Sequence, residues 1–384
     1  MLGYFRSECY YEKPYAGKLH VRFCEGLVSR GTSLLDLRIF VGVSYMNNLV
    51  VPKVIRKGDT IALISISGGR AGDEDMLYRF QIGKQRLEKI WNVNVVPTPN
   101  ALKGSQFLYE HPEARADDLM WALKNNTVNG IICMMGGDDS YRVFPYIDLD
   151  VIKKNPKVFM GYSDIASWMA VFAKAGVRAY YGPNLLTPIA QPIKLDEYTK
   201  TAITKTIFST NIIGEVTPCA EVTNIEWRNV DIEDIVWTPN TGYKVLQGKG
   251  TVRGRLFGGT VGPLRQIMGT EYFPDKDFFK DCILVLENCA PYGSMLASLH
   301  DLRALDAAGV FQNAAGIITG KLNAEEESMW LKFMKYEAKR EDIPILTNVD
   351  FVHRTPMTVL PMGALAEIDC QNEKFVILEA GVVE

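Results

Sequence analysis

The chain has 384 residues, of which 47% are hydrophobic and 23% are charged, as is common in globular proteins that fold in water. The net charge of −3 gives no reason to expect a nucleic-acid polymer or an acidic membrane surface as a partner. No apolar run reaches the roughly 18 residues of a membrane-spanning helix, and the length exceeds that of a typical single domain. We therefore expect two domains and no membrane segment.

The seven cysteines are scattered and form no Cys-x-x-Cys pair, so their spacing does not indicate a zinc ribbon. Their odd number and the chain length argue against a disulfide scaffold. Cys133 and Cys282 lie in apolar runs, as small buried residues do. The sequence therefore favours a reducing cytoplasm, and it indicates no metal and no other cofactor.

Residues 1–45 mix Tyr, Arg, Cys and Gly without a clear period, and they lack the small-residue cleavage pattern of a secretory signal peptide. Met46 comes shortly before the first strand-like segment. We expect an atypical N-terminal extension over 1–45 and hypothesise that Met46 is the natural initiator. A tail or a mitochondrial-type presequence is the alternative interpretation of the same residues.

From residue 55 onward, short apolar strands alternate with amphipathic helices, which predicts an α/β fold with a parallel sheet covered by helices on both faces. In such a sheet the reactive groups collect beyond the carboxyl ends of the strands. We expect an N-terminal domain over 46–212 that carries the nucleophile. Its predicted strands are 60–66, 93–96, 130–135 and 158–160, and its predicted helices are 75–89, 115–124 and 165–175.

The pattern weakens after this domain, where polar and acidic residues surround Trp227 and Trp237. We expect a connecting loop over 213–249 that contacts the substrate, because loops of such length are commonly functional. Regular alternation returns in a C-terminal α/β domain over 250–384. Its regular segments are 250–259, a helix at 261–268, a strand at 282–286, a helix at 294–308, a strand at 316–319 and short β-like runs from 344.

Ser163 follows the apolar strand 158–160 after Gly161 and Tyr162, and a helix is predicted directly after it. A serine at a sharp strand-to-helix turn exposes its hydroxyl group, and the helix N-terminus directs amide groups at the same spot. Ser163 is therefore a candidate nucleophile, and the amide of Asp164 is placed to hold an oxyanion. By itself the local pattern favours a helix N-cap at Ser163 or Asp164, because such residues commonly precede helices.

Gly136 and Gly137 end another predicted strand, and glycine allows a backbone amide to approach a ligand closely. An ordinary strand-ending turn is the simpler explanation of this pair by itself. Asp138 and Asp139 follow, but no histidine or further acidic cluster lies close in the sequence. The sequence therefore does not favour a metal site at this point.

Glu287 ends the apolar run 283–286, and a charged residue rarely lies directly against a core strand without a task. A strand end that is exposed to solvent explains Glu287 equally well. Among the four histidines, His353 lies just before the apolar run 357–360 and is the preferred general base, although a lone histidine is more often structural. Spacing alone does not connect Glu287 and His353 to Ser163.

The order of the motifs connects them. The motifs are Gly136-Gly137, Gly161-Tyr162-Ser163-Asp164, the Gly-rich stretch 254–259, Leu286-Glu287 followed by Pro291-Tyr292, and Phe351-x-His353 followed by Pro356, Leu360-Pro361 and Gly363. With these motifs in this order, the chain from about Val54 to its C-terminus resembles the serine peptidases of the LD-carboxypeptidase and microcin C immunity protein family. The resemblance implies a Rossmann-like N-terminal domain and a β-rich C-terminal domain.

The resemblance also implies a Ser-His-Glu triad split across the two domains. In it His353 takes the proton from Ser163, while Glu287 orients His353 and stabilises its imidazolium. The amides of Gly137 and Asp164 are implied to form the oxyanion hole. Family members are commonly homodimers that need no metal, so we expect a homodimer here.

Four residues depart from the family pattern. Val352 and Arg354 stand where the family usually has Gly and Thr, Asn288 stands where a second acid is common, and Thr260 stands where an Asn is common. None of these changes removes a member of the triad. Because of these changes, the sequence does not determine the shape of the pocket, and therefore it does not determine the substrate.

The family acts on two classes of substrate, the L,D-peptide bond of murein tetrapeptides and the amide of a peptidyl-nucleotide such as microcin C. The resemblance favours the second class, because the chain has the longer build and the loop tryptophans of the immunity branch. One interpretation is that Trp227 and Trp237 stack on a nucleobase, an interaction that contributes about 1–3 kcal/mol to binding. The alternative is that one or both only attach the loop to the body of the protein. Together with Gly136 they are the expected substrate contacts.

A catalytically idle small-molecule-binding module is the alternative from another class, and Val352 and Arg354 motivate it. A nucleotide-dependent enzyme is disfavoured, because no G-x-G-x-x-G or P-loop pattern follows the first strand.

Overall fold

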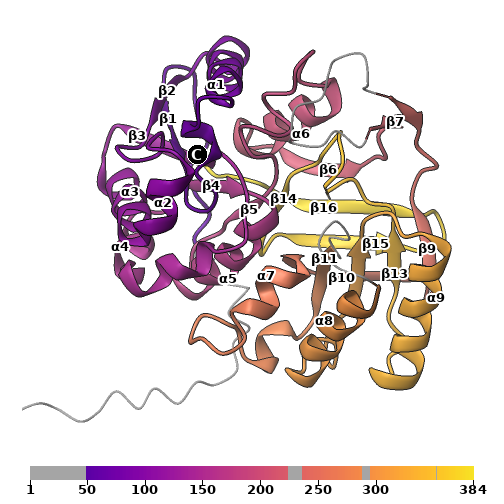
Figure 1. Cartoon of the computed structure of the whole chain (residues 1–384). Helices are drawn as coiled ribbons and strands as arrows, with labels where there is room; N and C mark the ends of the chain where they lie inside the picture. The colour runs from indigo at the N-terminus through magenta and orange to yellow at the C-terminus, as the bar shows by residue number, and fades with distance from the viewer. Residues whose placement is uncertain (1–48, 224–235, 288–294, 352) are drawn as a thin grey trace, which may run out of the picture. The chain divides into compact units, whose positions relative to one another are not determined.

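A computed structural model of the protein describes residues 49–223, 236–287, 295–351 and 353–384 (Figure 1). The predicted extension 1–45, the predicted substrate contact Trp227 and the departures Asn288 and Val352 lie outside these residues. Within the described ranges no helix has the length and apolar character needed to cross a membrane. The predicted fold class is confirmed, since a parallel sheet flanked by helices is followed by a second sheet with its own helices.

The first sheet has six strands among the described residues, in the order β14-β5-β4-β3-β1-β2. Its first five strands along the chain are parallel, and β14 adds to β5 in the antiparallel sense. The strands are β1 (Thr60–Ile64), β2 (Asn94–Pro97), β3 (Val128–Cys133), β4 (Val158–Gly161), β5 (Tyr180–Tyr181) and β14 (Leu360–Pro361). The helices of this part are α1 (Leu77–Trp91), α2 (Ser105–Glu110), α3 (Pro112–Lys124), α4 (Leu149–Lys154), α5 (Ala166–Lys174) and α6 (Glu197–Ile207).

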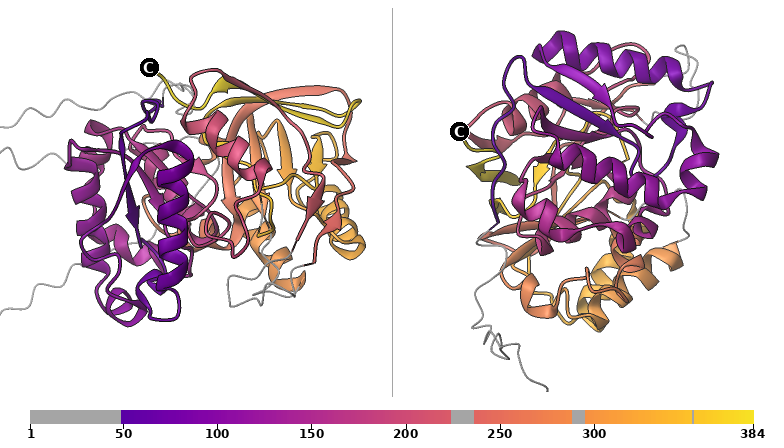
Figure 2. Two further views of the ribbon diagram at one scale, coloured as in Figure 1. Left: turned by 90° about the horizontal axis from the view of Figure 1, so that it is seen from above. Right: turned by 90° about the vertical axis from the view of Figure 1, so that its left-hand side faces the viewer.

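Strand β1 shows how helices cover both faces of this sheet (Figure 2). Ile61 and Leu63 pack into one hydrophobic cluster with Phe80 of α1, while Ala62 and Ile64 pack into another that contains residues of α3 and α5. Alternate side chains of a strand point to opposite faces, so a strand that is buried on both sides reads as a continuous apolar run.

Helix α1 forms because its apolar residues recur on one face. Phe80, Leu87 and Trp91 are buried at the helical spacing, with Gly83 between them where a side chain would strike Leu185. The helix ends at Asn92, whose φ of 53° is left-handed, a conformation that Asn tolerates better than most residues.

The second sheet has eight strands in the described part of the chain, in the order β6-β16-β15-β10-β11-β12-β13-β9. The central four are parallel and the outer ones antiparallel. The strands are β6 (Ile212–Val216), β9 (Lys244–Gln247), β10 (Thr251–Thr260), β11 (Cys282–Glu287), β12 (Gly316–Thr319), β13 (Ile345–Thr347), β15 (Leu365–Asp369) and β16 (Lys374–Ala380). Helices α7 (Val261–Gln266), α8 (Met295–Ala307) and α9 (Ala324–Lys332) accompany them.

The segment 213–249 is more regular than the connecting loop that its sequence suggests. It supplies both edge strands of the second sheet, β6 and β9, and a separate two-stranded ribbon of β7 (Glu221–Val222) and β8 (Thr238–Pro239). Edge strands are half exposed and carry polar residues, so their apolar periodicity is weak.

The C-terminal part of the chain returns to the first sheet through β14. Leu360 pairs with Tyr181 and Pro361 pairs with Tyr180, and the amide of Met362 donates to the carbonyl of Ala179 at 2.9 Å. The loop between β13 and β14 therefore leaves the second sheet and ends beside β5, next to the strand that precedes Ser163. This crossing brings residues of the two sheets to one place.

Gly258 controls the pairing of the two strands that lead to Thr260 and Glu287. Its φ of +145° disfavours any other residue, and an added Cβ would overlap the carbonyl group of Val285 on the neighbouring strand. We expect Gly258→Ala to lower the free energy of unfolding by about 3 kcal/mol or more, measured by urea denaturation.

Gly262→Ala is the matched control, because nothing lies within 4 Å of an added Cβ at this position of α7. It should change stability by about 0.5 kcal/mol or less. Equal stability of the two variants would contradict the role assigned to Gly258.

Candidate active site

Ser163 lies at a tight turn beyond the carboxyl end of β4. Its φ of +68° is left-handed, which is uncommon for a residue with a side chain. The short 3₁₀ turn Ser163–Ile165 follows and leads into α5. Neither this turn nor α5 receives a side-chain cap, so Ser163 and Asp164 are not helix N-caps in this structure. The turn leaves the Ser163 hydroxyl group free to face the second sheet.

A chain of hydrogen bonds joins Ser163, His353 and Glu287. The Nε2 atom of His353 lies 2.8 Å from Ser163 Oγ, and Nδ1 lies 2.7 Å from Glu287 Oε1. Because Nδ1 faces a carboxylate, it carries the ring proton, and Nε2 is left to accept from the serine hydroxyl group. The backbone amide of His353 also donates to Glu287 Oε1 at 2.7 Å, so the carboxylate holds both the ring and its backbone.

Tyr181 connects the other oxygen of Glu287 to the serine. The phenol donates to Glu287 Oε2 at 3.1 Å, and it also lies 2.8 Å from Thr260 Oγ1 and 3.3 Å from the amide nitrogen of Ser163. Thr260 Oγ1 lies 3.2 Å from Glu287 Oε2 as well. Since a phenol has one proton, its donation to Glu287 leaves the Tyr181 oxygen to accept from the Ser163 amide, while Thr260 uses its own proton for Glu287 Oε2.

Burial and these contacts set the ionisation of Glu287 and Tyr181. Burial opposes the charge on Glu287, but the proximity of His353 and the hydrogen bonds from His353 and Tyr181 outweigh it and lower the pKa of the carboxyl group. Burial, together with the nearby Glu287 carboxylate, raises the pKa of Tyr181 well above its ordinary value. Glu287 is therefore an acceptor and Tyr181 a donor at neutral pH.

The side chain of Asp164 ties the serine turn to two neighbouring loops. Its Oδ2 atom accepts from Ser67 Oγ at 2.6 Å, after β1, and from the amide of Ser140 at 2.8 Å, after β3. Asp164 is buried, and burial raises the pKa of its carboxyl group although these hydrogen bonds oppose the shift. The three strand ends thus converge on one side chain.

The glycine pair lies against these residues. An added Cβ at Gly136 would come within 2.7 Å of Ser163 Cβ, 2.9 Å of Ser163 Oγ and 3.5 Å of the Asp164 amide nitrogen. An added Cβ at Gly137 would overlap Ser67 Oγ. The absence of a side chain at Gly136 lets the backbone approach the serine hydroxyl group and the Asp164 amide, and its absence at Gly137 lets the loop pack against Ser67 and Gly68.

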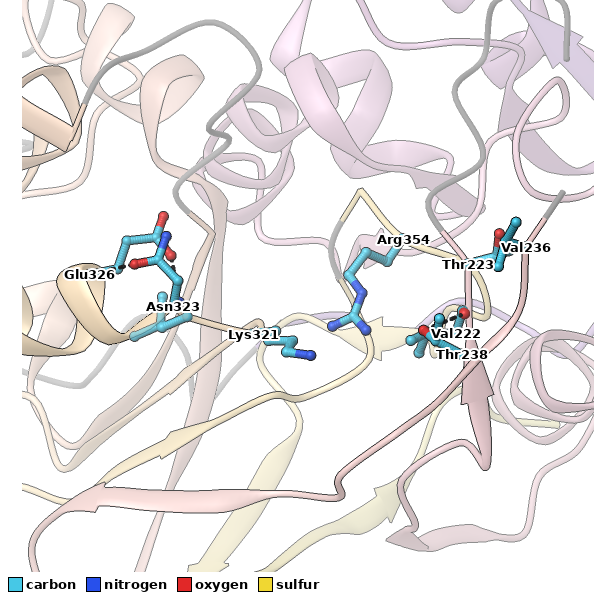
Figure 3. Close-up of a pocket in the computed structure, with 9 residues that line it drawn as sticks. Val222, Thr223, Val236, Thr238, Lys321, Asn323, Glu326 and Arg354 are labelled. Atoms are coloured by element: carbon cyan, nitrogen blue, oxygen red, sulfur yellow. Dashed lines mark hydrogen bonds between the residues drawn. The ribbon is translucent and has the colours of Figure 1, made fainter. Parts of the chain in front are cut away.

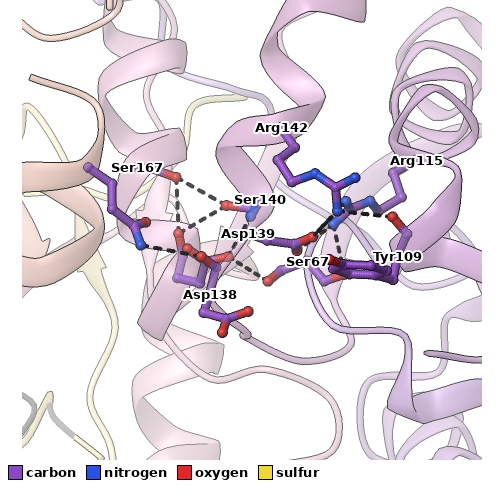
Figure 4. Close-up of polar contacts among 10 residues, drawn as sticks. Ser67, Tyr109, Arg115, Asp138, Asp139, Ser140, Arg142 and Ser167 are labelled. Atoms are coloured by element: carbon purple, nitrogen blue, oxygen red, sulfur yellow. Dashed lines mark hydrogen bonds and ion pairs between the residues drawn. The ribbon is translucent and has the colours of Figure 1, made fainter. Parts of the chain in front are cut away.

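Asp139, which the sequence places beside the glycine pair, is held by two arginines (Figure 4). The buried Arg115 donates to both of its oxygens, at 2.8 and 3.1 Å, and Arg142 donates at 2.9 Å. Arg115 also donates to the carbonyl of Ser67 at 3.2 Å. Asp139 therefore braces the loops after β1 and β3 through ion pairs.

A cavity of about 520 Å³ lies beside His353 (Figure 3). Arg354, the next residue in the chain, lines it together with residues of β7 and β8 and the residues that precede α9. Trp237 is half-buried and does not line the cavity, although Val236 and Thr238 on either side of it do. Of the expected substrate contacts, Gly136 lies beside Ser163, while Trp227 lies outside the described residues.

Sequence reasoning missed Tyr181, Ser67 and Ser140. Tyr181 ends β5, so its place at the carboxyl edge of the sheet was a signal that could have identified it. Ser67 follows the first predicted strand in the same way. Thr260 was noted only as a departure from the family pattern, and its hydrogen bond to Glu287 was not foreseen.

Comparison with known proteins gives matches over both parts of the chain. Residues 61–182 match the LD-carboxypeptidase N-terminal domain and residues 253–368 match the LD-carboxypeptidase C-terminal domain. The first segment contains Ser163, and the second contains Glu287 and His353.

Individual proteins match over most of their length. The putative carboxypeptidase YocD of Bacillus subtilis is 29% identical over 325 residues, which are 82% of this chain and 94% of that protein. The microcin C7 self-immunity protein MccF of Escherichia coli is 29% identical over 277 residues, 69% of this chain and 78% of MccF. The structure of an MccF-like protein from Streptococcus pneumoniae in complex with AMP has a TM-score of 0.74 at 28% identity and covers 83% of this chain and 98% of its own.

The lowered pKa of Glu287 has a consequence for stability. A carboxyl group whose pKa is lower in the folded than in the unfolded chain stabilises the fold above its ordinary pKa of 4.5, and this contribution is lost as the pH falls through the folded value. We expect wild type to be more stable than Glu287→Gln at about pH 6, with a difference that shrinks as the pH is lowered below the ordinary value.

Urea denaturation at several pH values measures this difference. Glu74→Gln, at an exposed position, is the control and should stay close to wild type throughout. A difference for Glu287→Gln that grows on acidification below the ordinary pKa would show that the sign is wrong.

Proposed function

Because this chain belongs to the LD-carboxypeptidase family, whose members are carboxypeptidase-like hydrolases, we propose that it is a serine hydrolase that cleaves an amide bond with Ser163, His353 and Glu287. The observation that carries this proposal is the hydrogen-bonded chain from Ser163 Oγ through both ring nitrogens of His353 to Glu287. Its distances fall in the range that a nucleophile, a general base and an orienting acid require.

The proposed reaction begins when His353 Nε2 takes the proton from Ser163 and Oγ attacks the carbonyl carbon of the amide. The amides of Gly137 and Asp164 then hold the negative oxygen of the tetrahedral intermediate. His353 gives its proton to the leaving nitrogen as the C–N bond breaks, which leaves an ester on Ser163. Water, deprotonated by His353, attacks the ester and releases the acid, and the proton returns to Ser163.

Glu287 acts through His353 in this mechanism. Its lowered pKa keeps it ionised, so it fixes the ring tautomer and stabilises the imidazolium that forms in each half-reaction. Tyr181 and Thr260 hold the second carboxylate oxygen and thereby prevent the acid from turning away from the ring. We assign both of them positioning roles.

For the substrate we propose the amide of a peptidyl-nucleotide of the microcin C type. Similarity to a microcin C7 self-immunity protein and to an MccF-like protein crystallised with AMP supports this class. Trp227 or Trp237 is proposed to stack on the nucleobase, and Gly136 to lie against the acyl group. The family description supports the second candidate, an LD-carboxypeptidase that acts on murein tetrapeptide.

Ser163→Ala tests the nucleophile. Wild type should release product from a peptidyl-sulfamoyl adenylate, and the variant should lose about 10⁴-fold or more of this activity without the Oγ atom. Product release is measured by chromatography, with murein tetrapeptide as the second substrate. Ser209→Ala, in a turn after α6, is the control and should keep wild-type activity.

Two results would count against the proposal. Equal activity of Ser163→Ala and wild type would remove Ser163 from the mechanism. Absence of turnover of both substrates by the wild type would favour a binding module.

Tyr181→Phe tests the positioning role of the phenol. The variant keeps the ring but leaves Glu287 Oε2 and the Ser163 amide each without one partner. We expect kcat to fall by about tenfold to a hundredfold, equal to about 1.4–2.7 kcal/mol, while KM stays nearly constant.

Tyr180→Phe is a matched control, because Tyr180 is also fully buried and its hydroxyl group donates to the carbonyl of Gly381 at 2.8 Å. It should lose stability but keep kcat. If both variants lose kcat to the same extent, the loss is structural and Tyr181 has no special role.

A further inference from the structure

We propose that Arg354 and Lys321 form a subsite that binds an anionic group of the substrate, a carboxylate or a phosphoryl-type group, in the cavity beside His353. The inference rests on the proposed function, because it places this group next to the amide that Ser163 attacks. Its starting point is the cavity of about 520 Å³ that both cations line.

The two cations face the same space from opposite walls. In Figure 3 the Arg354 side chain extends into the cavity between Lys321 and the ribbon of β7 and β8, and the Lys321 side chain points towards the guanidinium group. Lys321 is exposed and Arg354 is half-buried, so water screens part of the repulsion between these two like charges. An anion between them would turn this repulsion into attraction.

The structure provides only weak partners for these cations among the described residues. Arg354 donates a hydrogen bond of 3.4 Å to Asn348 Oδ1, and within the described residues neither cation forms an ion pair with a carboxylate. Burial raises the pKa of the buried Asp350 carboxyl group, although the charge of Arg354 opposes the shift. Asp350 already accepts from the amide of Cys219 at 2.8 Å and from Asn240 at 3.3 Å.

The acid that lines the cavity is also engaged elsewhere. Glu326 accepts from the amide of Asn323 at 2.8 Å, while Asn323 accepts from the amide of Glu326 at 3.0 Å, which together form the capping box of α9. The carboxylate of Glu326 is thereby held at the helix terminus. The cavity is thus lined by two cations that can bind an anion, and by one acid, Glu326, that already caps α9.

Backbone pairing ties one wall of the cavity to the chain segment that carries His353. The amide of Thr223 donates to the carbonyl of Thr355 at 2.8 Å, and the amide of Thr355 donates back to Thr223 at 3.2 Å. Thr223 lines the cavity, and Thr355 follows His353 and Arg354 in the chain. An anion on Arg354 would therefore be bound by the same short segment that carries the proposed general base.

The chemistry of the two side chains defines the ligand. The planar guanidinium group of Arg354 can bind two oxygens of a carboxylate or of a phosphoryl group at once, and the Lys321 ammonium group adds a point charge. The C-terminal carboxylate of a peptide and the phosphoryl or sulfamoyl group of a nucleotide conjugate both have this character.

Equilibrium binding to the Ser163→Ala protein tests the inference without turnover. Isothermal titration calorimetry compares AMP with adenosine, and murein tetrapeptide with its C-terminal amide. Arg354→Gln and Lys321→Gln, made in this background, should each weaken the binding of the preferred anionic probe about tenfold or more and change the binding of its counterpart without that anionic group by no more than about twofold. Lys249→Gln, an exposed cation in the turn before β10, is the control and should change neither.

The two pairs of probes distinguish the two possible sources of the bound anionic group. Selective loss of AMP binding assigns the subsite to a phosphoryl group, and selective loss of tetrapeptide binding assigns it to a carboxylate. Unchanged binding in both variants, or no binding of either anionic probe to the parent, overturns the inference.

The outcome is distinguishable from a failure of the proposed function. Hydrolysis that depends on Ser163 but not on Arg354 or Lys321 leaves the function standing and removes the subsite. Probe binding that depends on Arg354 and Lys321, in a wild-type protein that hydrolyses neither substrate, supports the subsite and removes the proposed hydrolysis.

Discussion

The buried carboxylate of Glu287 is the constraint on which the arrangement of the two sheets around the site depends. An ionised group removed from water is costly unless hydrogen-bond donors surround it. The backbone and ring of His353 donate to one oxygen, and Tyr181 and Thr260 lie within hydrogen-bond distance of the other. These donors come from β5, from the end of β10 and from the loop after β13, so the charge is satisfied only when both sheets are assembled.

The same assembly explains how Ser163 keeps an uncommon backbone conformation. A left-handed φ at a residue with a side chain persists only where its surroundings hold it. Asp164 is fixed by the loops after β1 and β3, and the amide of Ser163 lies against Tyr181. The turn is thus held from the first sheet, and its hydroxyl group is met by His353 from the loop that returns to β14.

Two kinds of residue surround this centre. Gly136 and Gly137 contribute by having no side chains, because a Cβ at Gly136 would strike Ser163 and a Cβ at Gly137 would strike Ser67. Arg354, immediately after His353, contributes a charge that lines a cavity. In the proposed mechanism and subsite, adjacent residues of one loop carry reaction geometry and substrate preference, so a change at Arg354 should alter the second while leaving the hydrogen bonds of His353 in place.

The sequence by itself determined the alternation of strands and helices, and with it the α/β class, because apolar periodicity is a local property. It also placed Ser163 at a strand-to-helix turn and, through the order of the motifs, identified His353 and Glu287 as its expected partners. Sequence analysis did not identify the edge strands β6 and β9, because half-exposed strands show only weak apolar periodicity.

Only the tertiary structure decided which side chains meet. Tyr181 and Glu287 are 106 positions apart in the chain, and Ser67 and Asp164 are 97 apart, so no local pattern connects them. The two local interpretations of Ser163, nucleophile or helix cap, differ in the direction in which its hydroxyl group points. The turn that sets this direction is held by contacts of Asp164 with the loops after β1 and β3 and of the Ser163 amide with Tyr181, which join segments that are distant in the chain.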